Sequence, residues 1–364
     1  MKEAGIISYL LVLFCSFLFV QCDSDYPYKP KQFVTPEPKS AFIAKSDLAS
    51  LIGKTDAKIV YTLEYQGRRT IYYVDFNDET PTAKKLKKPE GKELYHADSP
   101  LLSPDGEWVT YWMVKGGDNE VYVQKLDPDA TPKLISDPGG DPHWWEDSSG
   151  NLYVVFASTG EFLIGDITSV QDGWTKRQQV NKTDPTQMIG TAETLAPYPF
   201  RGGLSKDGRY LCTGYELAYF YDITNSLLVP ISGGSQICNP SIRPHTDSTD
   251  IMMFLNLQGY QKMNGFDSTL WIDQHQMIFT VDVSNTVLKY FDHTQFFATS
   301  KKQWQDPEWS NDPGYFSALA QDAGNDNWDC YIVRYSDGAY KTFNDPSEMS
   351  LNETSTPFIW INQN

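Results

Sequence analysis

Residues Ser99 to Trp112 read Ser-Pro-Leu-Leu-Ser-Pro-Asp-Gly-Glu-Trp-Val-Thr-Tyr-Trp, a pattern that returns along most of the chain. Pro100 suits the first position of a strand, because proline donates no hydrogen bond to a sheet. Ser103-Pro104-Asp105-Gly106 has the residue preferences of a type I turn. The aromatic and β-branched residues that follow predict a return strand. The unit is therefore a strand, a tight turn and a second strand.

Weaker copies of this unit follow along the chain. They begin at Asp141-Pro142, Gly202-Gly203, Asn239-Pro240 and Asp306-Pro307. Before the first copy, the segment from Lys58 predicts three strands without an opening one, and Ser355–Ile361 supplies the missing strand at the other end of the chain. Five internal starts and this closing strand predict an all-β fold over residues 42–364, a six-bladed β-propeller with four strands in each blade.

The proline, the Ser-Pro-Asp-Gly turn and a later Tyr/Val-rich strand ending in Asp together resemble the TolB-like β-propeller repeat. Two good copies and several degenerate ones span about Lys58 to Trp360. That family includes periplasmic partner-binding proteins and propellers fused to hydrolases. The resemblance therefore implies a propeller, and it implies no particular ligand.

The N-terminus predicts export. Residues 1–21 have the length of a signal peptide, with an apolar run from Ile6 to Val20. Phe19-Val20-Gln21-Cys22 resembles the lipobox of bacterial lipoproteins, which implies lipidation of Cys22. The Pro-rich residues 22–41 predict an extended tether. We expect a lipoprotein of the cell envelope that faces the periplasm or the exterior and meets the membrane only through its lipid anchor. Ordinary secretion is the alternative.

Charge and cysteine content narrow the function classes. The formal net charge of −17 opposes binding to nucleic acid or to an anionic membrane surface. In an oxidising compartment Cys212 and Cys238 are the best candidates for a disulfide. Burial of the cysteines as small apolar side chains is the alternative.

The sequence carries no nucleophile elbow, phosphate-binding loop, zinc-protease motif or calcium loop. Ser205, which precedes Lys206-Asp207-Gly208, is interpreted as a turn hydroxyl. An enzyme would need a site assembled from scattered positions, so we expect a non-catalytic protein without a cofactor.

One polar constellation does follow from the repeat. Residues beside the repeat prolines should gather where the innermost strands line the axial channel. They form the predicted channel mouth: His96, Asp98, Asp141, His143, Arg201, Asn239, Asp306 and Glu308. Two histidines and several carboxylates together are a donor set for a divalent metal ion or a cationic ligand. The alternative is a polar, water-filled channel.

Three long segments, Asn181–Phe200, Asn256–Gln276 and Asp292–Gln305, are predicted to be loops on the same side. They would bring exposed aromatic residues to a rim, of which we single out Tyr198, Tyr260, Trp271 and Trp304. The opposite face, with short turns that contain Lys206 and Asn311, is expected to be inert.

Two function classes remain. The favoured one is a non-catalytic envelope module that recognises a protein or a polysaccharide through the channel mouth. The other is a carbohydrate-active enzyme, either a metal-assisted lyase or a glycosidase with paired carboxylates such as Asp98, Asp141 and Asp306.

Overall fold

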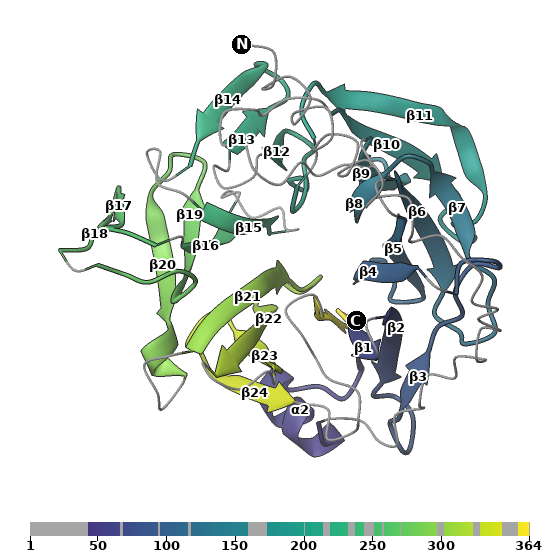
Figure 1. Ribbon diagram of the computed structural model, residues 1–364, viewed down its shortest axis with the longest axis horizontal. Helices are drawn as coiled ribbons and strands as arrows, with labels where there is room; N and C mark the ends of the chain where they lie inside the picture. Colours follow the sequence, from purple (N-terminus) through teal and green to yellow (C-terminus); the bar gives the residue numbers. More distant parts are fainter. Residues whose placement is uncertain are drawn as a thin grey trace, which may run out of the picture. The chain divides into compact units, whose positions relative to one another are not determined.

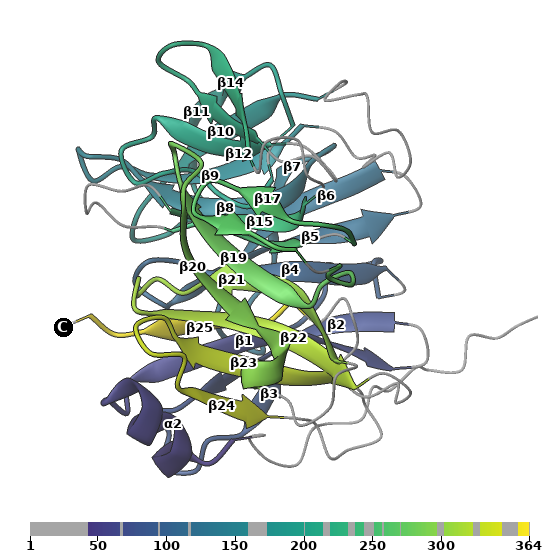
Figure 2. The same ribbon diagram turned by 90° about the vertical axis from the view of Figure 1, so that its left-hand side faces the viewer.

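The computed structural model describes residues 43–363 except 66–67, 94, 116–117, 159–172, 200, 214–218, 232–236, 244–250, 257, 270, 297–301, 323–327 and 344–355. The predicted signal peptide, Cys22 and the Pro-rich tether lie outside the described residues. Antiparallel sheets surround a common axis, as Figure 1 shows along that axis and Figure 2 from the side. The predicted six-bladed β-propeller is confirmed.

Each blade uses consecutive strands that run outward from the axis. Blade 1 contains β25 (Phe358–Ile361), β1 (Ala57–Tyr65), β2 (Arg68–Asp75) and β3 (Ala83–Lys85). Blade 2 contains β4 (His96–Leu102), β5 (Trp108–Lys115), β6 (Asp118–Lys125) and β7 (Lys133–Ser136). Blade 3 contains β8 (Gly140–Glu146), β9 (Leu152–Ala157), β10 (Thr175–Val180) and β11 (Met188–Ala196).

The second half follows the same plan. Blade 4 contains β12 (Tyr210–Thr213), β13 (Tyr219–Asp222) and β14 (Leu227–Pro230), and its innermost strand is reduced to a bridge between Leu204 and Leu211. Blade 5 contains β15 (Ile237–Ile242), β16 (Ile251–Asn256), β19 (Met277–Asp282) and β20 (Val287–Asp292). Blade 6 contains β21 (Lys302–Trp309), β22 (Tyr315–Asp322), β23 (Trp328–Arg334) and β24 (Tyr340–Phe343).

The core is divided among the interfaces between neighbouring blades. Each of the six interfaces holds its own apolar cluster, such as Val121 and Val123 of blade 2 against Val154 and Phe156 of blade 3. Both faces of a blade are therefore buried, which explains why every residue of β9 and β16 is buried. A single blade has no core of its own, so the ring stabilises all six together.

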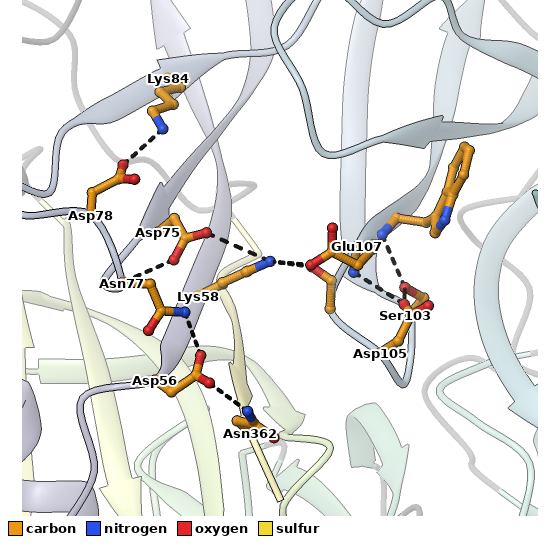
Figure 3. A network of polar contacts seen from close by, with 12 residues as sticks. Asp56, Lys58, Asp75, Asn77, Asp78, Lys84, Ser103, Asp105, Glu107 and Asn362 are labelled. Atoms are coloured by element: carbon orange, nitrogen blue, oxygen red, sulfur yellow. Dashed lines mark hydrogen bonds and ion pairs between the residues drawn. The ribbon is translucent and has the colours of Figure 1, made fainter. Parts of the chain in front are cut away.

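The two ends of the chain close the ring, as predicted. β25 pairs with β1 from Ala57 opposite Ile361 to Val60 opposite Phe358. Figure 3 shows the polar contacts around this seam, where Asn362 donates a hydrogen bond to Asp56. Lys58 joins blade 1 to the turn of blade 2, with its Nζ 2.8 Å from Glu107 Oε1.

The Ser-Pro-Asp-Gly turn also joins neighbouring blades. Ser103 Oγ donates to Asp105 and accepts from the backbone of Trp108 at 3.0 Å. The indole of Trp360 in blade 1 donates to the carbonyl of Pro104 at 2.9 Å and lies where a Cβ on Gly106 would be, 2.6 Å from the nearest ring atom. Glycine is needed here both for a φ of 71° and for this contact.

Two elements differ from expectation. The predicted loop at residues 181–200 contains β11, an outer strand that pairs with β10 although seven of its nine residues are exposed. Helix α2 (Lys45–Ile52) precedes the first blade and buries Leu48, Leu51 and Ile52 against blades 1 and 6. Within the described part of the chain, no helix has the length and apolar character needed to cross a membrane.

Candidate functional site

In every blade one residue within or just before the innermost strand has a positive φ, and it stands directly before the repeat proline or, in blade 4, before Gly203. The six φ angles lie between 23° and 67°. We call these residues the pre-proline ring: Ser99, Asp141, Gly202, Asn239, Asp306 and Thr356. A non-glycine residue in such a conformation costs about 1–3 kcal/mol, so its recurrence around the axis indicates a constraint imposed by the architecture.

The pre-proline ring coincides with β-bulges. In blade 2 the register between β4 and β5 shifts between Asp98 and Leu101, and equivalent shifts occur in blades 3, 5 and 6. A bulge bends a strand and changes the direction of its side chains. In these four blades the repeat proline therefore lies within the bulged part of the innermost strand.

Hydrogen bonds connect the pre-proline ring between blades. Asn239 of blade 5 donates to Asp306 of blade 6. The backbone N–H of Gly202 in blade 4 donates to Asp141 Oδ2 of blade 3 at 3.3 Å. These contacts join polar residues of blade 5 to blade 6 and of blade 4 to blade 3.

His96 and Asp98 lie beside an arginine of the neighbouring blade. Arg69 of β2 forms an ion pair with Asp98, and its Nε donates to His96 Nδ1 at 3.2 Å. Burial raises the pKa of Asp98 to about 6 despite the opposing charge of Arg69, and the charge of Asp141 adds to the rise. Burial and the charge of Arg69 lower the pKa of His96. Asp98 is thus already neutralised by a partner from the protein.

The residue after the repeat proline faces a cavity of about 240 Å³ in the axial channel in blades 1, 2, 3 and 6, and Leu204 and Ile242 take this place in blades 4 and 5. Every blade contributes to its lining, which includes Leu101, His143, Leu204, Ile242, Glu308 and Phe358. The following turns supply Pro104, Lys206 and Asn311. The cavity therefore occupies the half of the channel nearer the Ser-Pro-Asp-Gly turns.

Glu308 and Glu146 are the two glutamates that line this cavity, and Glu308 lies on the innermost strand of blade 6. Its Oε1 accepts a hydrogen bond from Ser241 Oγ at 2.9 Å. Burial raises the pKa of Glu308 well above its ordinary value, and the charges of Asp141 and Asp306 raise it further. His143 is half-buried, and its partial removal from water lowers its pKa. Both shifts favour the uncharged forms, the protonated carboxyl group of Glu308 and the neutral imidazole of His143.

The raised pKa of Glu308 predicts how the free energy of unfolding depends on pH. Because folded Glu308 keeps its proton to a higher pH than in the unfolded chain, the free energy of unfolding should fall as pH rises above about 4.3. Asp98 acts in the same direction up to its pKa of about 6. Glu308→Gln should show a smaller fall in urea unfolding between about pH 4 and about pH 8. Parallel pH profiles for wild type and variant would contradict this assignment.

The predicted channel-mouth residues are divided by the structure. His143 and Glu308 line the cavity, and Asp141 and Asp306 act on Glu308 electrostatically. Arg201 precedes Gly202, and its backbone N–H donates to the carbonyl of Cys212 at 3.1 Å. Cys212 itself is a buried, free thiol, the second of the two alternatives for the cysteines.

The aromatic rim is only partly present. Tyr260 and Trp271 are 64% and 54% exposed, with ring centroids 5.3 Å apart, near the small hairpin of β17 (Lys262–Met263) and β18 (Phe266–Asp267) at the left of Figure 1. Tyr198 packs edge-on against Tyr221 at 5.1 Å.

The placement of Trp304 in a surface loop is wrong. Trp304 belongs to β21, opposite Ala320 of β22, and is fully buried between blades 5 and 6. The innermost strand of blade 6 begins at Lys302, inside the segment that was expected to be a loop.

The turn face is not the featureless surface that the sequence suggested, because Lys206 and Asn311 both line the cavity. Sequence reasoning also missed the apolar lining residues Leu101, Leu204 and Phe358. A usable signal existed, since each of these residues directly follows a repeat proline or Gly203. The repeat predicts where these residues lie along the strand. It does not predict which way they point, because a β-bulge changes the direction of the side chains.

Neither a nucleophile nor a metal centre stands out in the described residues. Ser205 is fully buried and its Oγ donates to Asp207 at 2.6 Å, as a turn hydroxyl does. Across the described ranges, no group of three or more His, Cys, Asp or Glu residues is arranged to hold a metal ion.

Comparisons with known proteins agree with the fold. No family model and no curated protein sequence matches the chain. TolB from Acinetobacter baumannii is similar in structure, with a TM-score of 0.51 and 14% identity over 86% of this chain and 68% of TolB. Hydrazine synthase from Kuenenia stuttgartiensis gives a TM-score of 0.53 and 11% identity, over 85% of this chain and 48% of that one. At such identities the similarity shows a propeller fold like that of TolB and nothing about the ligand.

Proposed function

We propose that this protein is an exported, lipid-anchored binding module of the bacterial cell envelope, and that it holds its ligand in the axial channel without transforming it. The observation that carries the proposal is the cavity of about 240 Å³ to which all six blades contribute. Concave sites with mostly apolar walls and a few polar groups are typical of ligand recognition.

The shape of the site favours a small group over a polysaccharide chain. The cavity lies in the channel between the innermost strands, whereas an extended glycan usually needs an open groove. A protein partner could fill the cavity by inserting one side chain, and a small molecule could enter it whole. Two exposed aromatic residues, Tyr260 and Trp271, are the main support for glycan binding, and they belong to an insertion of blade 5.

A carbohydrate-active enzyme is the second candidate. The observation in its favour is the raised pKa of Glu308, because a general acid must keep its proton to a higher pH than an ordinary carboxyl group does. The two functions differ in outcome, since an enzyme returns a cleaved product and a binding module returns its ligand intact.

The binding test uses channel-filling variants. Purified wild-type protein is incubated with an envelope extract of the producing cells, washed, and the retained small molecules and peptides are identified by mass spectrometry. Leu204→Trp and Leu101→Trp place bulk in the cavity and should each lose the retained ligand. Leu227→Trp in β14 is the matched control, because Leu227 is 55% exposed. Variants that melt like the wild type and retain the same ligand would contradict the proposal.

The anchor is tested separately. Cys22→Ser should move the protein from the membrane fraction to the soluble fraction, since an acyl chain supplies the membrane affinity. Fractionation followed by intact-mass measurement would detect the loss of lipid. A variant that stays in the membrane fraction with the mass of unlipidated protein would show that Cys22 is not the anchor.

A further inference from the structure

The walls of the axial cavity are aromatic and aliphatic. Trp144 and Phe358 line it together with Leu101, Leu204 and Ile242. Phe358 is 6% exposed and Leu204 is 7% exposed, so the innermost strands hold both side chains firmly. A ligand that enters the cavity loses most of its water, and any charge it carries must find a partner there.

The polar side of the cavity is acidic. Glu308 uses only Oε1 in its hydrogen bond with Ser241, and Oε2 has no hydrogen-bond partner among the described residues. Asp141 and Asp306 lie close enough to raise the pKa of Glu308 by their charge. In the described ranges these carboxyl groups form no cluster that could hold a metal ion.

We infer that the axial cavity binds an organic ammonium group, with the cation at Glu308 and its hydrocarbon part against Trp144, Phe358 and Leu204. The inference rests on the proposed function and names the chemistry of its ligand. The ammonium group has two sources, a free amine or the lysine side chain of a protein partner.

An organic ammonium ion can interact both with the aromatic walls of the cavity and with the carboxyl group of Glu308. Aromatic side chains attract cations through the negative faces of their rings, and a carboxylate with a free oxygen accepts a charge-assisted hydrogen bond. Anionic ligands are repelled by the acidic groups, and neutral ligands gain nothing from them. Lys206 is the cationic side chain in the lining. Its Nζ donates a hydrogen bond to the carbonyl oxygen of Glu146 at 3.2 Å and makes none to Glu308.

Binding should be coupled to the ionisation of Glu308. The titratable groups that act on it or share its cavity are Asp141, Asp306, Cys212, His143, Glu146 and Lys206. In the free protein the raised pKa of Glu308 favours its protonated form, whereas a bound ammonium ion favours the carboxylate. Its O–H bond then breaks, the proton passes to the buffer and the carboxylate pairs with the ligand. Affinity should therefore rise with pH until Glu308 ionises in the free protein.

Titration calorimetry with matched probes tests the inference. 2-Phenylethylamine is compared with its neutral analogue 2-phenylethanol, and the peptide acetyl-glycyl-lysyl-glycinamide with the same peptide carrying norleucine. Each ammonium probe that fits should bind about tenfold or more tightly than its neutral analogue. Measurements in two buffers of different ionisation enthalpy should show the release of up to about one proton for each ligand bound.

Variants assign the effect to Glu308. Glu308→Gln should remove the preference for the ammonium probe and the proton release, and it should leave the weak binding of the neutral analogue unchanged. Glu79→Gln removes an exposed carboxyl group in a turn of blade 1 and should change neither. Binding of the amine alone identifies a free amine as the source, and binding of the lysine peptide alone identifies a protein side chain.

Equal binding of charged and neutral probes would overturn the inference, as would the absence of binding by both ammonium probes up to about 10 mM. An ammonium preference that persists in Glu308→Gln would also overturn it. The proposed function is judged independently, because it stands if Leu204→Trp still abolishes retention of the ligand from the envelope extract.

Discussion

Truncation of the chain after Thr354 should abolish cooperative unfolding of the propeller. The deletion removes β25, whose four side chains are each at most 6% exposed. Burial of a large apolar side chain contributes about 1.5–3 kcal/mol, so the strand contributes about 6–12 kcal/mol. This is comparable with the whole stability of a typical domain, about 5–15 kcal/mol. The deletion also exposes β1, which pairs with β25 over residues 57–60.

Thermal and urea unfolding of the truncated protein would measure this effect. A chain that ends at Asn362 is the matched control, because it keeps β25 and the hydrogen bond from Asn362 to Asp56. The control should unfold like the wild type. A truncated protein with an undiminished melting temperature would show that β25 does not close the ring.

Gly202→Ala should produce the largest loss of stability among the glycine substitutions in this chain. A Cβ at Gly202 would lie 1.5 Å from the carbonyl oxygen of Pro240, a backbone atom of the next blade. Gly202 also accepts a hydrogen bond from the N–H of Ile242 at 2.6 Å, so the two innermost strands cannot separate without breaking it. We expect a loss of about 4 kcal/mol or more.

Gly150→Ala is the control that separates steric clash from backbone strain. Gly150 has a φ of 80°, similar to the 67° of Gly202, but no atom lies within 4 Å of its virtual Cβ. It should therefore lose only about 1 kcal/mol, the cost of the left-handed conformation. Equal losses in urea unfolding of the two variants would show that blades 4 and 5 do not approach as closely as described.

Much of the fold could be predicted because the repeat contains proline and glycine, two residues with special backbone conformations. Proline in the innermost strand and glycine in the turn each fix a local conformation, and their spacing predicted the number of blades. The closing strand followed from a first unit that lacked one. Helix α2 escaped prediction because its N-cap is Ala44, which makes no side-chain hydrogen bond, and because only three of its eight residues are buried.

The site was harder to predict, because sequence spacing does not show which way the side chains of a bulged strand point. Sequence spacing placed Asp141, Asp306 and Glu308 near one another, and their mutual effect on the pKa of Glu308 agrees with this. Spacing did not reveal that Arg69, from the neighbouring blade, neutralises Asp98. It also did not reveal that the residues after the repeat prolines line a cavity near the turns, because the orientation of a bulged strand depends on its neighbours.

The central claim is that the axial channel holds the ligand. A crystal structure of the protein with the molecule retained from the envelope extract tests it most directly. We predict electron density for that molecule in the axial cavity, within contact distance of Glu308, Leu204 and Phe358. Density at Tyr260 and Trp271 with an empty channel would contradict the account.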